Sequence, residues 1–226
     1  MSGFYVWSNT FQSSNVSAVG LAPTAQNYSQ LGEERGPSDN DRRHVASVSG
    51  IWHIDYFKGS SSIAKQVLNG WTLSSVASLQ SGSPFTITTG SDNNKDGYNN
   101  DRPNLVPGVS PFLDPNRSRS AAALAWFNKA AFTPNGPGLG IGPGGADGTT
   151  PRNYLRAPGY RNIDIGVLRD FRFAERYTLQ FRGEATNAFN MVSLNTPTSS
   201  LSSASVGQIT SAATPRIIQV GARFNF

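Results

Sequence analysis

The C-terminal residues alternate between apolar and polar side chains with a period of two. The apolar positions are Ile218, Val220, Ala222, Phe224 and Phe226, and the positions between them are Gln219, Gly221, Arg223 and Asn225. Because successive side chains of a β-strand point to opposite faces, this pattern predicts a strand with one apolar and one polar face. A transmembrane strand needs about 9–11 residues, which this segment provides. A soluble sandwich would bury the apolar face and blunt the edge, whereas a membrane barrel turns it to lipid and pairs the edge.

Other segments with alternating or aromatic-rich sequences predict further strands. They lie at residues 3–10, 44–56, 71–80, 162–173 and 177–186, and the strand at 71–80 is expected to continue at 85–89. Trp52 and Tyr56 lie near the end of one apolar face, where a membrane barrel carries its aromatic girdle. The sequence therefore predicts an all-β fold with about six antiparallel strands.

The predicted connections between the strands alternate in length. Long, polar, turn-rich connections cover residues 11–41, 90–160 and 187–214, and short ones cover 57–70 and 174–176. The longest is expected to be irregular apart from a helical piece near 120–129. A compact soluble domain rarely contains so long a loop, but outer-membrane barrels have long outer loops and short periplasmic turns. The alternation predicts an up-and-down barrel with the three long connections on the outer side and the C-terminus on the periplasmic side.

The amino-acid composition of the chain excludes or disfavours several classes of function. Hydrophobic residues make up 37% of the 226 residues, and the longest apolar run, 121–127, is far shorter than a membrane-spanning helix. Cysteine is absent, so disulfides and thiolate metal sites are excluded. The net charge of +5 comes from scattered Lys and Arg residues, which argues against nucleic-acid binding. The two histidines, His44 and His53, have no partners in the sequence that indicate catalysis, and we expect no enzymatic activity.

A tight loop at 174–176 fixes a predicted register for the hairpin around it. Because opposed residues must share a face, Phe173 should pair with Tyr177 and Asp170 with Gln180. Arg182 then lies on the diagonal from Asp170, within reach of a charge contact.

One segment resembles the first half of a calcium-binding loop. Asp92-Asn93-Asn94-Lys95-Asp96-Gly97 follows the pattern Asp-x-Asn-x-Asp-Gly, in which alternate oxygens converge on a cation and glycine permits the turn. Pro103 stands where the bidentate Glu is expected, so Asp101 or a backbone carbonyl would complete the shell. Asp92, Asn94, Asp96 and Asp101 are therefore a candidate Ca²⁺ site, and an ordinary polar turn is the alternative.

Charged residues on the predicted polar faces form a second candidate set. They are Asp164, Asp170, Arg182, Glu184 and Arg223. In a barrel these side chains would face the lumen, where they could line a substrate path or, as the favoured interpretation, pair with one another.

Several sequence blocks, in order, resemble Oar-like TonB-dependent receptors of the outer membrane. The blocks are Glu34 to His44, Leu68 to Ser74, Leu79 to Phe85, Asp101 to Leu105, Trp126 to Asn128 with Ala131-Phe132, and Arg182 to Asn190. The final strand also resembles the C-terminal signal that barrels present to their assembly machinery, which gives Phe224 and Phe226 a role in assembly.

The resemblance implies a place in a larger protein. Such receptors are similar to 22-stranded barrels with an N-terminal plug, TonB engages a segment ahead of the plug, and the Oar-like group adds a carboxypeptidase-regulatory-like domain. The chain, residues 1–226, would be the C-terminal part of that barrel in a Gram-negative outer membrane. Its partners would be outer-membrane lipid, the assembly machinery and, through the missing N-terminal part, TonB; alone it should not transport a ligand.

A soluble secreted all-β module that binds glycans or Ca²⁺ is the alternative function. In that case the aromatic residues and the Asp92 loop would form the binding site. The lipid-like strand faces and the family blocks favour the receptor.

Overall fold

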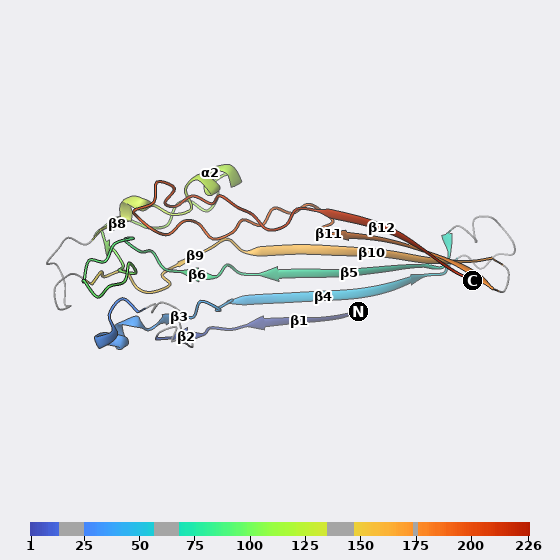
Figure 1. Cartoon of the computed structure of the whole chain (residues 1–226), viewed down its shortest axis with the longest axis horizontal. Coiled ribbons are helices and arrows are strands. Elements are labelled where there is room, and N and C mark those ends of the chain that lie inside the picture. The colour runs from blue at the N-terminus through green and yellow to red at the C-terminus, as the bar shows by residue number, and fades with distance from the viewer. Residues whose placement is uncertain (14–24, 57–67, 135–146, 174–175) are drawn as a thin grey trace.

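A six-stranded antiparallel sheet runs along the length of the molecule (Figure 1). The computed structural model describes residues 1–13, 25–56, 68–134, 147–173 and 176–226. The strands occur in chain order across the sheet, and they are β1 (Ser2–Trp7), β4 (His44–Ile54), β5 (Trp71–Gln80), β10 (Tyr160–Phe173), β11 (Tyr177–Thr186) and β12 (Ile217–Asn225). Their number, antiparallel pairing and up-and-down order confirm the predicted all-β fold. The sheet is open in the described part of the chain, with β1 and β12 at its edges.

The register of the β10–β11 hairpin is the one that its tight loop predicts. Phe173 pairs with Tyr177 and Asp170 with Gln180. The Gln180 amide donates a hydrogen bond of 2.9 Å to the Asp170 carboxylate. The predicted diagonal contact was wrong, because Arg182 forms its ion pair with Glu184 on its own strand.

The register between neighbouring strands places their apolar residues on the same face across the whole sheet. Val48 lies opposite Ala77, which lies opposite Ile163, and Leu179 lies opposite Phe224 at the far edge. These side chains share the face with Ile218, Val220 and Ala222, as the terminal alternation predicts. All side chains of β12 are exposed, so the described part of the chain leaves the apolar face uncovered at this edge of the sheet.

The two ends of the sheet differ. One end holds the pairs Ile54–Trp71 and Phe173–Tyr177, together with the C-terminus. The three long connections gather at the opposite end (Figure 1). This arrangement confirms that the long connections lie together at the end of the sheet opposite the C-terminus. Residues 57–67 and 174–175 of the short connections lie outside the described part.

The long connections fold into a cap rather than the irregular loops that we expected. We call their described residues, 11–13, 25–43, 81–134, 147–159 and 187–214, the cap. Its elements are β2 (Phe11–Gln12), η1 (Tyr28–Glu34), β3 (Gly36–Pro37), β6 (Pro84–Phe85), β7 (Asn104–Leu105), α2 (Arg119–Leu124), η2 (Lys129–Ala131), β8 (Phe132–Thr133) and β9 (Leu155–Arg156). The predicted continuation of β5 at 85–89 was wrong, because β6 pairs with β9 in a separate sheet. The expected helix near 120–129 is shorter and ends at Leu124.

The hydrophobic core lies in the cap and not on the sheet. Its buried members come from three separate stretches of the cap, and they are Phe85, Ile87, Phe127, Ala131, Phe132, Leu155 and Ala157. The ring of Phe127 contacts those of Phe85 and Phe132, with centroids 6.1 and 5.7 Å apart. This small core joins the segments that position the polar site described next.

Candidate functional site

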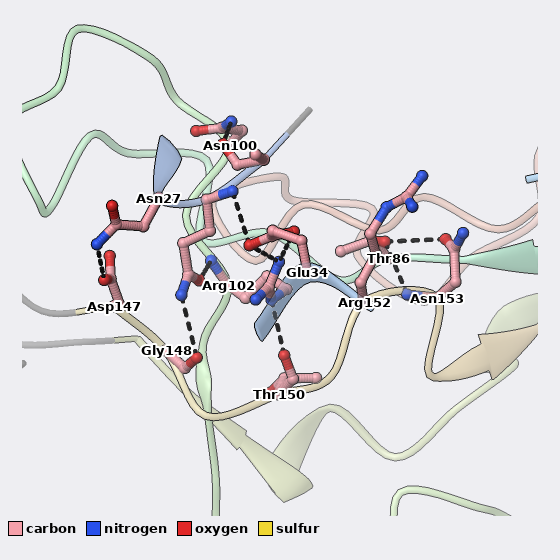
Figure 2. A network of polar contacts seen from close by, with 12 residues as sticks. Asn27, Glu34, Thr86, Asn100, Arg102, Asp147, Gly148, Thr150, Arg152 and Asn153 are labelled. Carbon is pink, nitrogen blue, oxygen red and sulfur yellow. Dashed lines mark hydrogen bonds and ion pairs between the residues drawn. The ribbon is translucent and has the colours of Figure 1, made fainter. Parts of the chain in front are cut away.

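A buried ion pair lies at the centre of the cap. Arg102 Nη1 donates to both carboxylate oxygens of Glu34, at 2.8 and 2.7 Å. Arg102 Nε donates to the carbonyl of Thr150 at 2.8 Å (Figure 2). The two charged side chains are 4% and 1% exposed. Removing one partner of such a pair leaves a buried charge unpaired and costs about 3–5 kcal/mol. The contact therefore fixes the chain segments of Glu34, Arg102 and Thr150 relative to one another.

Gln26 extends the same network through its backbone and its amide. Its backbone N–H donates to Glu34 Oε1 at 3.0 Å, and its side-chain oxygen accepts from the Arg102 backbone N–H at 2.7 Å. The amide nitrogen donates to the carbonyl of Gly148 at 3.2 Å. A Cβ at Gly148 would lie 1.7 Å from the Arg102 carbonyl oxygen, so only glycine permits this approach of the two backbones.

Two more ion pairs join residues 147–157 to the segment before β4. Arg152 binds Asp39 at 3.1 Å, and Arg156 binds Asp41. Burial raises the pKa of Asp41, but the hydrogen bond and charge of Arg156 and the backbone N–H of Thr10 outweigh burial, so the pKa is lowered overall. Asp41 is therefore held ionised as a structural anchor of the cap.

The candidate calcium loop is a tight turn closed by its own side chains. Asp92 accepts from the backbone N–H groups of Asp96 and Gly97, at 3.1 and 2.9 Å. Asn94 Oδ1 also accepts from the Asp96 N–H, at 3.1 Å, and Asp96 accepts from Tyr98 at 2.9 Å. The side-chain oxygens of Asp92, Asn94 and Asp96 thus all lie along one turn.

The cap holds this loop through Asn94 and Asp101. The buried Asn94 amide donates to the Gln26 carbonyl at 2.7 Å and to Asp147 at 3.2 Å. Asp101 Oδ2 accepts from the backbone N–H groups of Asn93 and Asn94. These bonds orient the amide nitrogen of Asn94 into the cap and its oxygen toward the loop.

Asp101 is a fully buried carboxylate with one oxygen that has no hydrogen-bond partner. Its exposed fraction is 0%, and Oδ1 has no donor within reach. Burial raises the pKa of Asp101, the Asn93 and Asn94 amides oppose that rise, and the charges of Asp96 and Asp92 add to it. In residues 1–13, 25–56, 68–134, 147–173 and 176–226, no three His, Cys, Asp or Glu side chains gather closely enough to hold a metal ion. The loop therefore brings acidic side chains near Asp101 without enclosing a point between three carboxylates.

The five charged residues expected in the lumen share the polar face of the sheet, but they do not form one cluster. Arg182 pairs with Glu184. The other three bind neutral groups: Asp164 accepts from the Asn187 N–H at 2.9 Å, Asp170 from Gln180, and Arg223 donates to Asn225 at 3.1 Å. Mutual charge pairing is thus limited to one exposed pair, which contributes little to stability.

Sequence reasoning missed Arg169, the charged residue buried on the apolar face. Arg169 is 5% exposed and lies opposite Trp71 on β5. Its guanidinium carbon is 5.2 Å from the centre of the Trp71 ring and 4.4 Å from that of Phe171. Arg169 and most of the apolar residues of β10 have odd residue numbers. Because side chains alternate along a strand, this position could have placed Arg169 on the apolar face. Cation–π contact with two rings offsets part of the cost of placing this charge among apolar side chains.

Aromatic side chains also surround the C-terminus. Phe224 stacks on Tyr177, with ring centroids 5.8 Å apart, and Phe226 lies 6.4 Å beyond Phe224. Phe226 is 94% exposed, so its ring adds little to packing within the chain.

A largely apolar face, a polar opposite face and long connections at one end only are the features of an outer-membrane barrel wall. A family described as an outer membrane beta barrel domain matches residues 1–219. The chain belongs to this family. As an outer membrane beta barrel protein, it is located in the outer membrane.

The other comparisons add no closer relative. The search of the curated proteins and the search of the solved structures gave no match. Among the described residues, no helix is long and apolar enough to cross a membrane.

Proposed function

We propose that the chain forms the C-terminal part of the barrel of an Oar-like TonB-dependent receptor, which takes up a ligand across the outer membrane. The observation that carries this proposal is the open sheet. In the part of the chain that the structure describes, β1 and β12 each have one neighbouring strand, so each presents a row of backbone N–H and C=O groups along its other edge.

Open strand edges are costly in a bilayer. Each unsatisfied backbone group in the hydrocarbon region costs several kcal/mol, which is why membrane sheets close into barrels. The two edges therefore need strand partners beyond these six strands. A 22-stranded barrel supplies them and leaves room for a plug, in agreement with the sequence blocks that resemble the receptors.

The cap supports a role in ligand capture. In the proposed barrel, the cap lies on the outer side of the membrane, above the lumen. Its buried ion pairs hold its loops in a defined shape. The polar face with Asp164, Asp170, Arg182, Glu184 and Arg223 would line the inner wall below it. We favour the receptor over the soluble secreted module, because the chain belongs to a family of outer-membrane barrels, and a barrel wall of this kind turns an apolar strand face to lipid.

The experiment uses the native protein in the bacterium that makes it. An antibody against the cap should detect, in outer-membrane fractions, a heat-modifiable polypeptide several times longer than 226 residues. The purified native protein should also bind the periplasmic domain of TonB. A native polypeptide of 226 residues would refute the larger single-chain barrel, and an intact protein that fails to bind TonB would refute TonB-dependent uptake.

A further inference from the structure

We propose that the loop from Asp92 to Asp101 binds one Ca²⁺ ion in the cap. This inference stands apart from the proposed uptake function, because it rests on the oxygen atoms and charges of the loop alone.

The backbone has the conformation that a calcium loop of this pattern requires. Gly97, at the sixth position, has φ +94°, which favours glycine, and Lys95 at the fourth has φ +60°. Such a loop takes ligands from its first, third and fifth side chains and from the carbonyl of its seventh residue. Here these are Asp92, Asn94, Asp96 and the main chain of Tyr98.

The side-chain oxygens still have capacity to bind a cation. An ionised carboxylate offers about four lone-pair sites and an amide oxygen two. Asp92 uses two of its sites in the turn, and Asp96 and Asn94 use one each. The hydrogen bonds that form the turn therefore leave acceptor sites on all three residues.

Charge provides the second, independent observation. Asp101 is fully buried, its Oδ2 lies against the loop backbone, and its Oδ1 has no donor. None of the ion pairs found in the described residues includes Asp92, Asp96 or Asp101. A buried carboxylate without a countercharge is costly, and a divalent cation in the adjacent loop would neutralise it.

The type of ligand atom in the loop determines which metal ion fits it. Oxygen-only ligands in an irregular loop suit Ca²⁺, whereas Mg²⁺ needs near-ideal octahedral geometry, and Zn²⁺ favours His and Cys ligands. Because no three carboxylates converge in the described residues, the proposed shell combines Asp92 and Asp96 with amide and main-chain oxygens. Asp101 supplies negative charge from behind the loop. With Pro103 in place of the bidentate Glu, we expect a dissociation constant of about 10⁻⁴–10⁻³ M, the range of extracellular calcium modules.

Calorimetry on the chelator-treated protein in detergent micelles tests the proposal. Titration with CaCl₂ should give saturable heat, and MgCl₂ at the same concentration should bind at least about tenfold more weakly. Asp96→Ala should weaken Ca²⁺ binding by at least about tenfold. Asp114→Ala is the matched control, since Asp114 is a cap carboxylate that closes a similar turn with the Asn116 N–H at 2.8 Å; its affinity should equal that of the unaltered protein.

Asp101→Asn keeps an acceptor for the loop amides but removes the charge, so it tests the site even if Asp96→Ala disturbs the fold. The variant should weaken Ca²⁺ binding, because the negative charge behind the loop is gone. Without Ca²⁺ it should make the cap more resistant to proteolysis, since a buried charge is gone. Equal heats from the unaltered protein and both variants, or no saturable Ca²⁺ heat at millimolar concentration, would overturn the proposal.

Discussion

Val220→Arg should impair insertion of the barrel far more than Gln219→Arg, although the two positions are adjacent. Val220 is 74% exposed on the apolar face and lies opposite Gly183, which has no side chain to cover it. It is the fourth residue of the nine in β12, close to the middle of the strand. Lipid is therefore the environment that a new Arg side chain would meet.

The magnitude follows from depth in the membrane. An Arg on the lipid face costs about 2–4 kcal/mol at the midplane, which corresponds to about 30- to 700-fold in the folding equilibrium at 1.4 kcal/mol per tenfold. Gln219 lies opposite Glu184 on the polar face. An Arg there gains a cross-strand carboxylate, which contributes about 0.2–1 kcal/mol, so this variant should be neutral or slightly stabilised.

The assay is the amount of heat-modifiable, folded protein in outer-membrane fractions. We expect strong loss for Val220→Arg and none for Gln219→Arg. Equal assembly of the two variants would refute the assignment of this face to lipid. Loss for Gln219→Arg alone would show that the two faces are reversed.

Three further predictions concern the cap and the C-terminus. Glu34→Gln leaves the charge of Arg102 buried without a partner and should destabilise the cap by about 3–5 kcal/mol. Proteolysis of the cap should become faster, whereas the control Glu33→Gln, on the exposed neighbouring residue, should have no effect. Asp41 has a lowered pKa, so its contribution to stability is present when the pH is above its ordinary pKa of 3.8 and is lost as the pH falls through its lowered pKa. Protection of the cap from proteolysis, measured against pH, should therefore decline only in that acid range. Deleting Phe226 should lower outer-membrane abundance without changing the thermal stability of protein already inserted, and unchanged abundance would refute its role as an assembly signal.

The sheet could be predicted from the sequence because its determinants are local. Alternation alone placed the final strand at 218–226, against Ile217–Asn225 in the structure. The hairpin register followed from a loop of three residues, and a slip by one residue would have moved Asp170 and Gln180 off the polar face. Both arguments need only neighbours along the chain or across one turn.

The cap could not be predicted in this way. Its contacts join residues far apart in sequence, such as Gln26 and Gly148, which are 122 positions apart. Its buried polar residues, among them Glu34 and Arg102, have the composition of a solvated loop. Only the Asp92 loop was visible beforehand, because its spacing is a local motif; the burial of Asp101 behind it required the fold.

Sheet and cap are thus stabilised by different interactions, and this difference has consequences for function. In the proposed receptor, the exposed faces and open edges of the sheet would depend on lipid and on further strands, so the stability of the sheet would belong to the complete barrel in the membrane. The cap has its own small core and buried ion pairs, and the ion pair of Asp41 with Arg156 weakens as the pH falls through the lowered pKa of Asp41. On our proposal, the Asp92 loop adds a dependence on Ca²⁺. A change in the medium outside the cell should therefore alter the cap before it alters the barrel wall. If the chain is part of the proposed receptor, we expect regulation of ligand entry to lie in the cap, where the buried charges hold the loops together.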